Sequence, residues 1–238
     1  MKCDLCPRKC LVDRKKGEKG ICGQTENLKV ARAALHFWEE PCISGDAGSG
    51  AVFFSGCPLH CVFCQNENIA NGTVGKEISL ERLVDIFLEL QEKRANNINL
   101  VTPGHFVPQI VKALDQARRE GLTLPVVYNT SSYETVDTIK MLEGYVDIYL
   151  PDFKYMSPVL SKKYSHAPDY AQVAKAAIAE MVRQTGKAVF VNGDEDNLIL
   201  RGTIVRHLTL PGCMADSMQI LKYLHETYGD MIYISIMN

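Results

Sequence analysis

The sequence predicts an α/β protein in which a mostly parallel sheet follows a small cysteine-rich segment. Two observations predict the sheet: from Gly50 onward, short apolar runs alternate with amphipathic segments, and polar residues directly follow most of these runs. A third observation sets residues 1–45 apart, because they hold five of the nine cysteines and a basic stretch from Arg14 to Lys19. We therefore expect a metal-binding appendage over residues 1–45 and an α/β core over residues 46–238.

The first part of the core is expected to hold four strands with helices between them. An apolar run such as Ala51-Val52-Phe53-Phe54 suits a parallel strand that is buried on both faces. Ser79 is placed to cap the first helix, whose apolar residues recur at helical spacing. The expected strands cover residues 51–54, 99–101, 125–128 and 146–150, and the expected helices cover residues 79–93, 107–121 and 136–142.

The second part of the core continues this alternation after a longer connection. The turn-rich Asn192-Gly193-Asp194 between two apolar runs predicts a β-hairpin insert. The expected elements are a helix over residues 170–186, hairpin arms over 188–191 and 198–200, a strand over 203–208, a helix around 221–228 and a strand over 231–237. Six strand–helix repeats imply right-handed crossovers in either a doubly wound sheet or an incomplete barrel.

Composition excludes several classes of function. The chain has 238 residues, of which 46% are hydrophobic, and its 26 Lys and Arg against 28 Asp and Glu give a net charge of −2. This balance argues against nucleic acid as the main partner, since duplex-binding proteins usually carry a basic face. The amino terminus does not resemble a signal peptide, and no stretch of about 18 apolar residues could span a membrane. We expect a cytoplasmic protein, in which thiols stay reduced and can bind metal.

The most specific motif is C-x3-C-x2-C, formed by Cys57, Cys61 and Cys64 after the first core strand. Three thiolates on one short loop can bind three irons of a [4Fe-4S] cluster and leave the fourth iron open. A structural zinc site is the alternative, with His105 or Cys213 as a more distant fourth ligand. Disulfides explain the pattern poorly, because nine cysteines is an odd number.

A second set of four cysteines lies in the amino-terminal segment, at Cys3, Cys6, Cys10 and Cys22. A segment this short cannot fold on apolar burial alone, so a bound metal is expected to stabilise it. Zinc and a second iron–sulfur cluster are both compatible with four cysteine ligands.

Polar residues gather where the expected strands end. In parallel α/β folds these carboxyl ends meet at one edge of the sheet, where ligands bind. The residues concerned are Thr102 and His105 after the second strand, Asn129 after the third, Asp152 and Lys154 after the fourth, and Arg206 in the fifth. A site that joins the cysteine loop to these residues is therefore predicted.

These residues carry a resemblance to a known family. The C-x3-C-x2-C motif with Phe63 before its last cysteine resembles the radical S-adenosylmethionine superfamily. Asp152-Phe153-Lys154 and the Arg206…Pro211-Gly212 element resemble glycyl-radical-enzyme activases such as pyruvate formate-lyase activating enzyme. The whole chain, including Glu39-Glu40-Pro41-Cys42-Ile43-Ser44-Gly45 and Cys64-Gln65-Asn66, is similar to activase-like homologues with an amino-terminal cysteine-rich segment.

The resemblance implies a partial (β/α)6 barrel and a radical enzyme. Such relatives continue past the sixth strand, so a core truncated after residue 238 is expected, with one side of the site open. A reduced [4Fe-4S] cluster on Cys57, Cys61 and Cys64 would pass one electron to S-adenosylmethionine and give a 5′-deoxyadenosyl radical, which abstracts hydrogen from a substrate. Reduced flavodoxin or ferredoxin is the implied electron donor. The substrate could be a protein, a peptide or a small molecule, and glycyl radical formation is one implied outcome.

The resemblance also suggests roles for individual residues. Arg206 and Lys154 are expected to bind a carboxylate of the cofactor or a substrate anion. Asn129 and Asp152 are expected to bind cofactor hydroxyls or a monovalent cation. The remaining residues expected near the cofactor are Phe63, beside the adenine, and Asn66, Thr102 and His105.

Two departures from the family pattern stand out. Many relatives have two glycines and a glutamate after the second strand, where this chain has Thr102-Pro103-Gly104-His105. A neutral His105 can accept one hydrogen bond from an ammonium group, whereas a protonated one would repel it. Ser131-Ser132 also replaces the glycines that usually follow the third strand.

Two classes of function compete. The first is the radical enzyme, and the second is a non-enzymatic metalloprotein, either an iron–sulfur electron carrier or a zinc-stabilised interaction protein. The size of the α/β core and the charged groups expected on the cluster side favour the enzyme. A fourth cysteine ligand, from Cys213 or Cys42, would favour the carrier.

Overall fold

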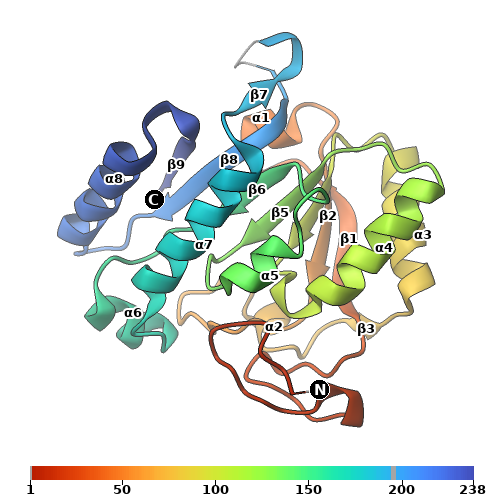
Figure 1. Ribbon diagram of the computed structural model, residues 1–238, viewed down its shortest axis with the longest axis horizontal. Coiled ribbons are helices and arrows are strands. Elements are labelled where there is room, and N and C mark those ends of the chain that lie inside the picture. Colours follow the sequence, from red (N-terminus) through yellow and green to blue (C-terminus); the bar gives the residue numbers. More distant parts are fainter. Residues whose placement is uncertain (1, 194–196) are drawn as a thin grey trace.

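The computed structural model describes residues 2–193 and 197–238, which form one curved α/β sheet with helices packed against it (Figure 1). The strands are β1 (Lys29–His36), β2 (Ser49–Phe54), β3 (Lys76–Glu77), β4 (Ile98–Val101), β5 (Val126–Thr130), β6 (Ile148–Pro151), β7 (Val189–Phe190), β8 (Ile199–Leu208) and β9 (Tyr233–Met237). The helices are α1 (Pro41–Ser44), α2 (Glu67–Ala70), α3 (Leu80–Glu92), α4 (Val107–Arg119), α5 (Val136–Lys140), α6 (Pro158–Ser165), α7 (Tyr170–Thr185) and α8 (Met214–Tyr228). Short 3-10 turns cover Arg14–Lys16, Gly104–Phe106, Val191–Gly193 and Gly229–Met231.

The strand order confirms the predicted fold class. Strands β2, β4, β5, β6, β8 and β9 pair in parallel, each with the next, and they correspond to the six predicted core strands. The sheet continues from β2 to the antiparallel β1 and β3 and does not close on itself. The molecule is therefore a partial barrel, open between its two edges.

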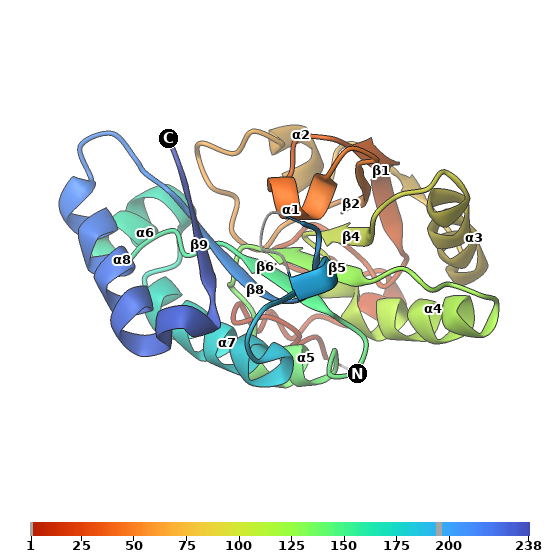
Figure 2. The ribbon, with the colours of Figure 1, turned by 90° about the horizontal axis from the view of Figure 1, so that it is seen from above.

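The two faces of the sheet have different cores. Outward-facing residues of β4, β5 and β6 pack with apolar residues of α3, α4 and α7, such as Phe87 and Leu114, which are completely buried. Ile43 of α1 packs on the inner face against Val127 and Ile148. Figure 2 shows α4, α5 and α7 along one side of the sheet and α1 on the other. Each fully buried Leu or Phe stabilises this arrangement by about 1.5–3 kcal/mol.

Helix α3 follows the predicted capping pattern. The Ser79 hydroxyl accepts a hydrogen bond from the Arg82 N–H at 3.1 Å, which satisfies one of the free donors at the helix start. Its buried residues Leu83, Phe87 and Leu90 recur at helical spacing. The predicted span of residues 79–93 thus matches the observed helix and its two caps.

Strand β1 was not predicted. It lies inside residues 1–45 and pairs antiparallel with β2, with His36 opposite Ser49 and Ala34 opposite Ala51. Its sequence, KVARAALH, lacks a clean alternation of apolar and polar residues, so local pattern does not reveal it. Residues 29–36 belong to the same sheet as the core strands, and the division of the chain at residue 45 stays a prediction.

The predicted hairpin insert differs in one respect. Strand β7 pairs antiparallel with β8 as expected, but the second hairpin arm and the fifth core strand form one continuous strand. Gly202 permits this continuity, because its φ of +148° and the close approach of Ala188 leave no room for a side chain. The turn residue Asp194 lies outside the described residues.

Among residues 2–193 and 197–238, no helix combines the length and the apolar character needed to cross a lipid bilayer.

Candidate active site

The cysteine loop leaves β2 at its carboxyl end, as predicted. Gly56 allows the turn, with a φ of +91°, and the Cys22 carbonyl oxygen fills the space that a side chain would need. Burial raises the pKa of the Cys57 thiol to about 12, and Cys61 and Cys64 lie close enough to add to this effect. Burial likewise raises the pKa of Cys64, so ionisation of Cys57 and Cys64 is favoured only beside a positive centre. Such a donor set fits a metal cluster, because metal binding deprotonates its thiol ligands.

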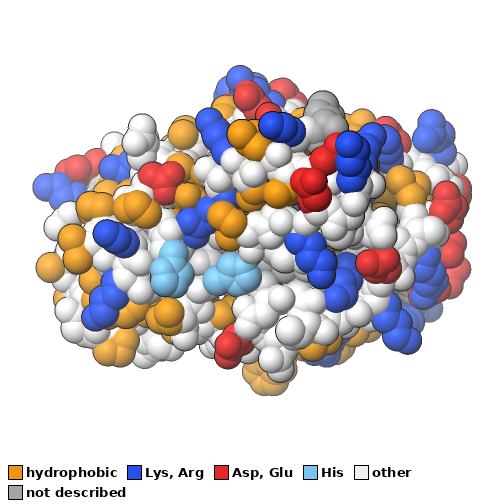
Figure 3. Space-filling model, turned by 90° about the horizontal axis from the view of Figure 1, so that it is seen from below, with side chains coloured by type: hydrophobic (Ala, Val, Ile, Leu, Met, Phe, Trp, Pro, Cys, Tyr) orange, Lys and Arg blue, Asp and Glu red, His pale blue; other side chains and the backbone are white. Residues whose placement is uncertain are grey.

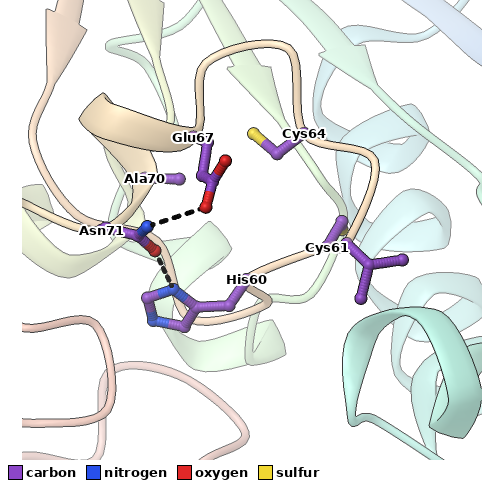
Figure 4. A pocket seen from close by; sticks show the side chains of 7 residues that line it. His60, Cys61, Cys64, Glu67, Ala70 and Asn71 are labelled. Carbon is purple, nitrogen blue, oxygen red and sulfur yellow. Dashed lines mark hydrogen bonds between the residues drawn. The ribbon is translucent and has the colours of Figure 1, made fainter.

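A cavity of about 310 Å³ lies beside this loop. The Cys64 sulfur and the Glu67 carboxylate point into it, as Figure 4 shows. The His60 ring contacts Asn71 Oδ1 at 3.2 Å, and Asn71 Nδ2 donates to Glu67 Oε1 at 3.5 Å. These bonds hold the cysteine loop against α2.

The opposite side of the loop is held by α6. The Ser165 hydroxyl donates to Cys61 Sγ at 2.9 Å and lies 2.7 Å from the Tyr155 hydroxyl. The Phe63 ring packs edge-on against Tyr155 and Tyr164, at centroid distances of 6.4 and 6.3 Å. Phe63 therefore packs between the loop and α6.

The structure brings four of the predicted residues into one hydrogen-bonded network on the inner face of the sheet. Lys154 Nζ lies 2.6 Å from Asp152 Oδ2, and Arg206 Nε lies 2.9 Å from Asp152 Oδ1. Arg206 Nη2 donates to Asn129 Oδ1 at 2.7 Å. Strand alternation places Asn129 and Arg206 on this face, between residues whose side chains point outward.

The network has three further members, Glu39, Glu40 and Asn99, to which the sequence analysis gave no role in the site. Glu39 Oε1 accepts from Arg206 Nη1 at 2.8 Å, and Glu39 Oε2 accepts from Asn99 and Asn129 at 3.0 and 2.9 Å. Glu40 Oε2 lies 3.9 Å from Arg206 Nη1. The available signals were Asn99 inside an apolar strand and two acids directly before a proline.

The charges of this network balance if Glu40 holds a proton. Burial raises the pKa of Glu40 to about 7, although Arg206 opposes the shift. Burial would also raise the pKa of Asp152, but Arg206 and Lys154 hold it below its ordinary value. Asp152 and Glu39 then carry two negative charges against the positive charges of Arg206 and Lys154. The pKa of Lys154 is raised in spite of its burial, chiefly by Asp152 and to a smaller extent by Cys61.

The other predicted cofactor residues, His105, Thr102 and Asn66, lie in the connections that follow β4 and β2. His105 is fully buried, and burial lowers its pKa to about 3, so it is neutral. Its Nε2 bonds to the Ser55 carbonyl at 2.7 Å, which fixes the end of β2 just before the cysteine loop. Thr102 adopts a left-handed φ of +55° and donates its N–H to the Asn129 carbonyl, while Asn66 begins α2.

The cysteines considered as a fourth ligand have other surroundings. Cys213 precedes α8, and its backbone carbonyl accepts hydrogen bonds from the N–H groups of Asp216 and Ser217. Cys42 lies in α1, next to the inner apolar core.

The amino-terminal cysteines also lie close together. Two of the sulfurs lie close to the backbone of Gly20. A Cβ atom built on Gly20 would lie 3.2 Å from Cys10 Sγ and 3.7 Å from Cys22 Sγ. Burial raises the pKa of the Cys6 thiol to about 12 and also raises that of Cys22. We call residues 2–22, which also include Cys3, the N-terminal module.

Among the described residues, neither cysteine set is already drawn together around one ion. Within the described parts of the chain, no three Cys, His, Asp or Glu side chains are grouped to hold one metal ion. A cubane cluster requires a different spacing between its sulfur ligands than a single ion does, because each thiolate binds a separate iron.

Glu134 is a buried acid that the sequence did not single out. Its carboxylate lies against Gly104, where a Cβ would stand, and accepts from the Thr130 hydroxyl at 2.8 Å. Burial raises its pKa to about 7, from an ordinary value of 4.5. Between these pH values the folded state binds more protons than the unfolded state, so this group lowers stability as pH rises.

We expect Glu134→Gln to remove this pH dependence. Relative to the variant, the unmodified protein should lose about 3 kcal/mol of unfolding free energy between pH 4.5 and pH 8. Urea denaturation at both pH values measures the difference. Glu92→Gln, on the exposed face of α3, is the matched control and should track the unmodified protein; an identical pH profile for Glu134→Gln would contradict the assignment.

Comparison with known proteins agrees with this geometry. Residues 51–197 match the family model of the radical SAM superfamily. An uncharacterized protein of Methanocaldococcus jannaschii, MJ0674, is 28% identical over 215 residues, which cover 88% of this chain and 57% of that protein. This chain thus spans little more than half the length of that relative.

Two solved structures share the fold. HydG, a maturase of the [FeFe]-hydrogenase, aligns with a TM-score of 0.52 and 15% identity, over 76% of this chain and 41% of its own. Methylornithine synthase (PylB) aligns with a TM-score of 0.52 and 14% identity, over 76% of this chain and 50% of its own. At these identities the likeness establishes the fold alone. The family match covers more than half of the chain, which therefore belongs to the radical SAM superfamily, a family defined by a [4Fe-4S] cluster and S-adenosylmethionine.

Proposed function

We propose that this protein binds a [4Fe-4S] cluster through Cys57, Cys61 and Cys64 and uses it to cleave S-adenosylmethionine reductively. The observation that carries the proposal is the position of the three-cysteine loop at the carboxyl end of β2, in the same sheet whose inner face carries the ion-paired network of Asp152, Lys154 and Arg206. A bound cluster would supply the one electron needed to split a C–S bond of S-adenosylmethionine, and this cleavage would provide a radical able to abstract hydrogen from a substrate.

The residues of the chain would bind and orient the reactants. Arg206 presents a guanidinium that can bind a carboxylate through two parallel hydrogen bonds, if the ligand displaces one of its present partners. Lys154, paired with Asp152, carries a positive charge that favours the ionised form of Cys64, and it would stabilise a negatively charged cluster. Asn129 and Asp152 offer an amide and a carboxylate to the cofactor hydroxyls or to a monovalent cation.

The residues near the loop are proposed to support the same cofactor. Phe63 and Asn66 flank Cys64, and Thr102 begins the connection that follows β4. His105 is better suited to hold the loop than to receive an ammonium group, because its Nε2 is already bonded to Ser55. We propose that it acts through the position of the loop.

The finer assignment is an activase-like oxidoreductase that acts on a protein or peptide substrate, with glycyl radical formation as its product. The support for it is the set of activase-like elements, Asp152-Phe153-Lys154 and Arg206, which the structure joins in one network. Reduced flavodoxin or ferredoxin is proposed as the electron donor, and the cytoplasm as the compartment.

The N-terminal module is proposed to bind a second metal through Cys3, Cys6, Cys10 and Cys22. The support is the buried position of Cys6 and Cys22 and the hydrogen bond from the Ile21 N–H to Cys10 Sγ, at 3.4 Å. Zinc and an iron–sulfur cluster both suit four thiolates.

The proposed function predicts the result of anaerobic reconstitution. Protein reconstituted anaerobically with iron and sulfide should be brown and, with dithionite as reductant, should convert S-adenosylmethionine to methionine and 5′-deoxyadenosine. Liquid chromatography of the reaction measures the nucleoside. Stoichiometric zinc without iron in protein purified anaerobically, with no 5′-deoxyadenosine after reconstitution, would contradict the proposal.

A further inference from the structure

The N-terminal module packs directly onto the cysteine loop. The Arg8 guanidinium donates to the Pro58 carbonyl at 2.9 Å, and to the carbonyls of Ser165 and His166 at 3.0 and 2.6 Å. Ser165 in turn bonds to Cys61 Sγ. One side chain of the module therefore holds both the loop and the end of α6 that supports Cys61.

A second contact joins the two cysteine sets more closely. The His60 Nε2 lies 2.9 Å from the Ile21 carbonyl, next to Cys22. The Cys22 carbonyl also packs against Gly56, at the start of the loop. The backbone carbonyls of Ile21 and Cys22 thus contact the cysteine loop at His60 and Gly56.

The outer surface of the module is basic, although the whole chain is slightly acidic. Its exposed lysines are Lys2, Lys9, Lys15, Lys16 and Lys19. Its exposed acids are Asp4 and Glu18, so the surface carries an excess of three positive charges. Lys15 lies 4.0 Å from Glu26, a pair whose side chains are 66% and 44% exposed and which water therefore screens. Figure 3, which views the molecule from the side of the module, shows Lys and Arg side chains among apolar ones.

The module also exposes two large apolar side chains. Leu11 is 52% exposed and Ile21 is 50% exposed, and each directly follows or precedes a cysteine of the module. Exposed apolar side chains together with charged ones occur in small, transient protein interfaces. The charges of such an interface steer association and select a partner of the opposite sign.

We propose that the lysines of the N-terminal module, with Leu11 and Ile21, form the docking surface for an acidic one-electron carrier protein. This inference rests on the proposed function, which consumes one electron for each S-adenosylmethionine cleaved. The reduced carrier loses that electron, the iron–sulfur centre of this protein gains it, and cleavage of the C–S bond uses it. Charge complementarity identifies the carrier as acidic, and the contacts of Arg8 and His60 explain why docking here brings it near the cysteine loop.

The test reverses the charge of the docking surface. In Lys15→Glu/Lys16→Glu/Lys19→Glu, the KM for a reduced acidic flavodoxin should rise about tenfold, because electrostatic steering of this kind changes association rates by factors of 10 or more. Calorimetry should show a matching rise in the Kd for the same flavodoxin. Cleavage driven by dithionite, a small reductant that needs no docking, should proceed at the unmodified rate.

A matched control carries the same charge change on the outer helices. Lys93→Glu/Lys112→Glu/Lys222→Glu alters exposed lysines at α3, α4 and α8 and should leave both the KM and the Kd unchanged. Leu11→Asn should also weaken binding of flavodoxin, and asparagine suits the left-handed φ of +56° at that position.

Three outcomes distinguish a failure of the docking surface from a failure of the proposed function. An unchanged Kd and KM for flavodoxin in the module variant would overturn the docking surface. Equal weakening in the control variant would also overturn it, since the effect would then reflect net charge alone. Absence of 5′-deoxyadenosine from the unmodified protein with dithionite would refute the proposed function, and the Kd measurements would still decide where flavodoxin binds.

Discussion

Replacement of Cys61 by alanine is expected to reduce S-adenosylmethionine cleavage to the background of an iron-free sample. A cluster bound by three thiolates loses a third of its protein ligands, and the remaining two lie on a loop that Cys61 itself links to Ser165. Loss of an outer-shell partner of a metal ligand typically costs 10–100-fold, so loss of the ligand itself should cost more than about 100-fold. Iron content and the yield of 5′-deoxyadenosine measure the effect.

Two further cysteine variants make this prediction specific. Cys3→Ala should retain the cluster on the loop, because Cys3 belongs to the separate set in the N-terminal module. Cys213→Ala should retain full activity, because Cys213 lies at the start of α8. Equal loss in Cys61→Ala and Cys3→Ala would mean that the two sets form one site, and loss in Cys213→Ala would favour a four-ligand electron carrier.

Arg206→Ala is expected to destabilise the fold and abolish cofactor binding together. Removal of the guanidinium leaves Asp152 and Glu39 without their shared cation, in positions where their side chains are only 15% and 10% exposed. Breaking a buried ion pair from one side typically costs about 3–5 kcal/mol. Urea denaturation measures the loss, and S-adenosylmethionine binding to the reconstituted protein measures the second effect.

Arg206→Lys separates charge from geometry. Lysine keeps the positive charge but cannot reach Asp152, Asn129 and Glu39 at once, because it lacks the planar fork of arginine. Compared with Arg206→Ala, we expect Arg206→Lys to recover most of the unfolding free energy but little of the S-adenosylmethionine binding. Arg201→Ala, an exposed residue of the same strand, is the control; a similar loss of stability in that variant would contradict the role given to the network.

The sequence predicted the elements whose signals are local. All six parallel strands were predicted from short apolar runs that alternate with segments of helical periodicity. Ser79 indicated the start of α3. The cysteine loop was predictable because its three ligands lie within one short segment. Asn129, Asp152 and Arg206 were predictable because parallel strands end at a common edge.

The remaining features depend on contacts between distant segments. Glu39 and Asn99 are separated by 60 residues, and the pairing of β1 and β4 with β2 brings their segments together. Strand β1 pairs with β2 without a clear pattern of its own. The contact of Arg8 with Ser165 joins positions 157 residues apart, and no local signal in the sequence encodes it.

The most direct test is the electron paramagnetic resonance spectrum of the reduced, reconstituted protein with and without S-adenosylmethionine. An open iron on a three-thiolate cluster should bind the added ligand and change the g values, and the change should be absent in Cys61→Ala. A reduced cluster whose spectrum is identical in both samples would show that all its irons are already ligated, and would contradict the account.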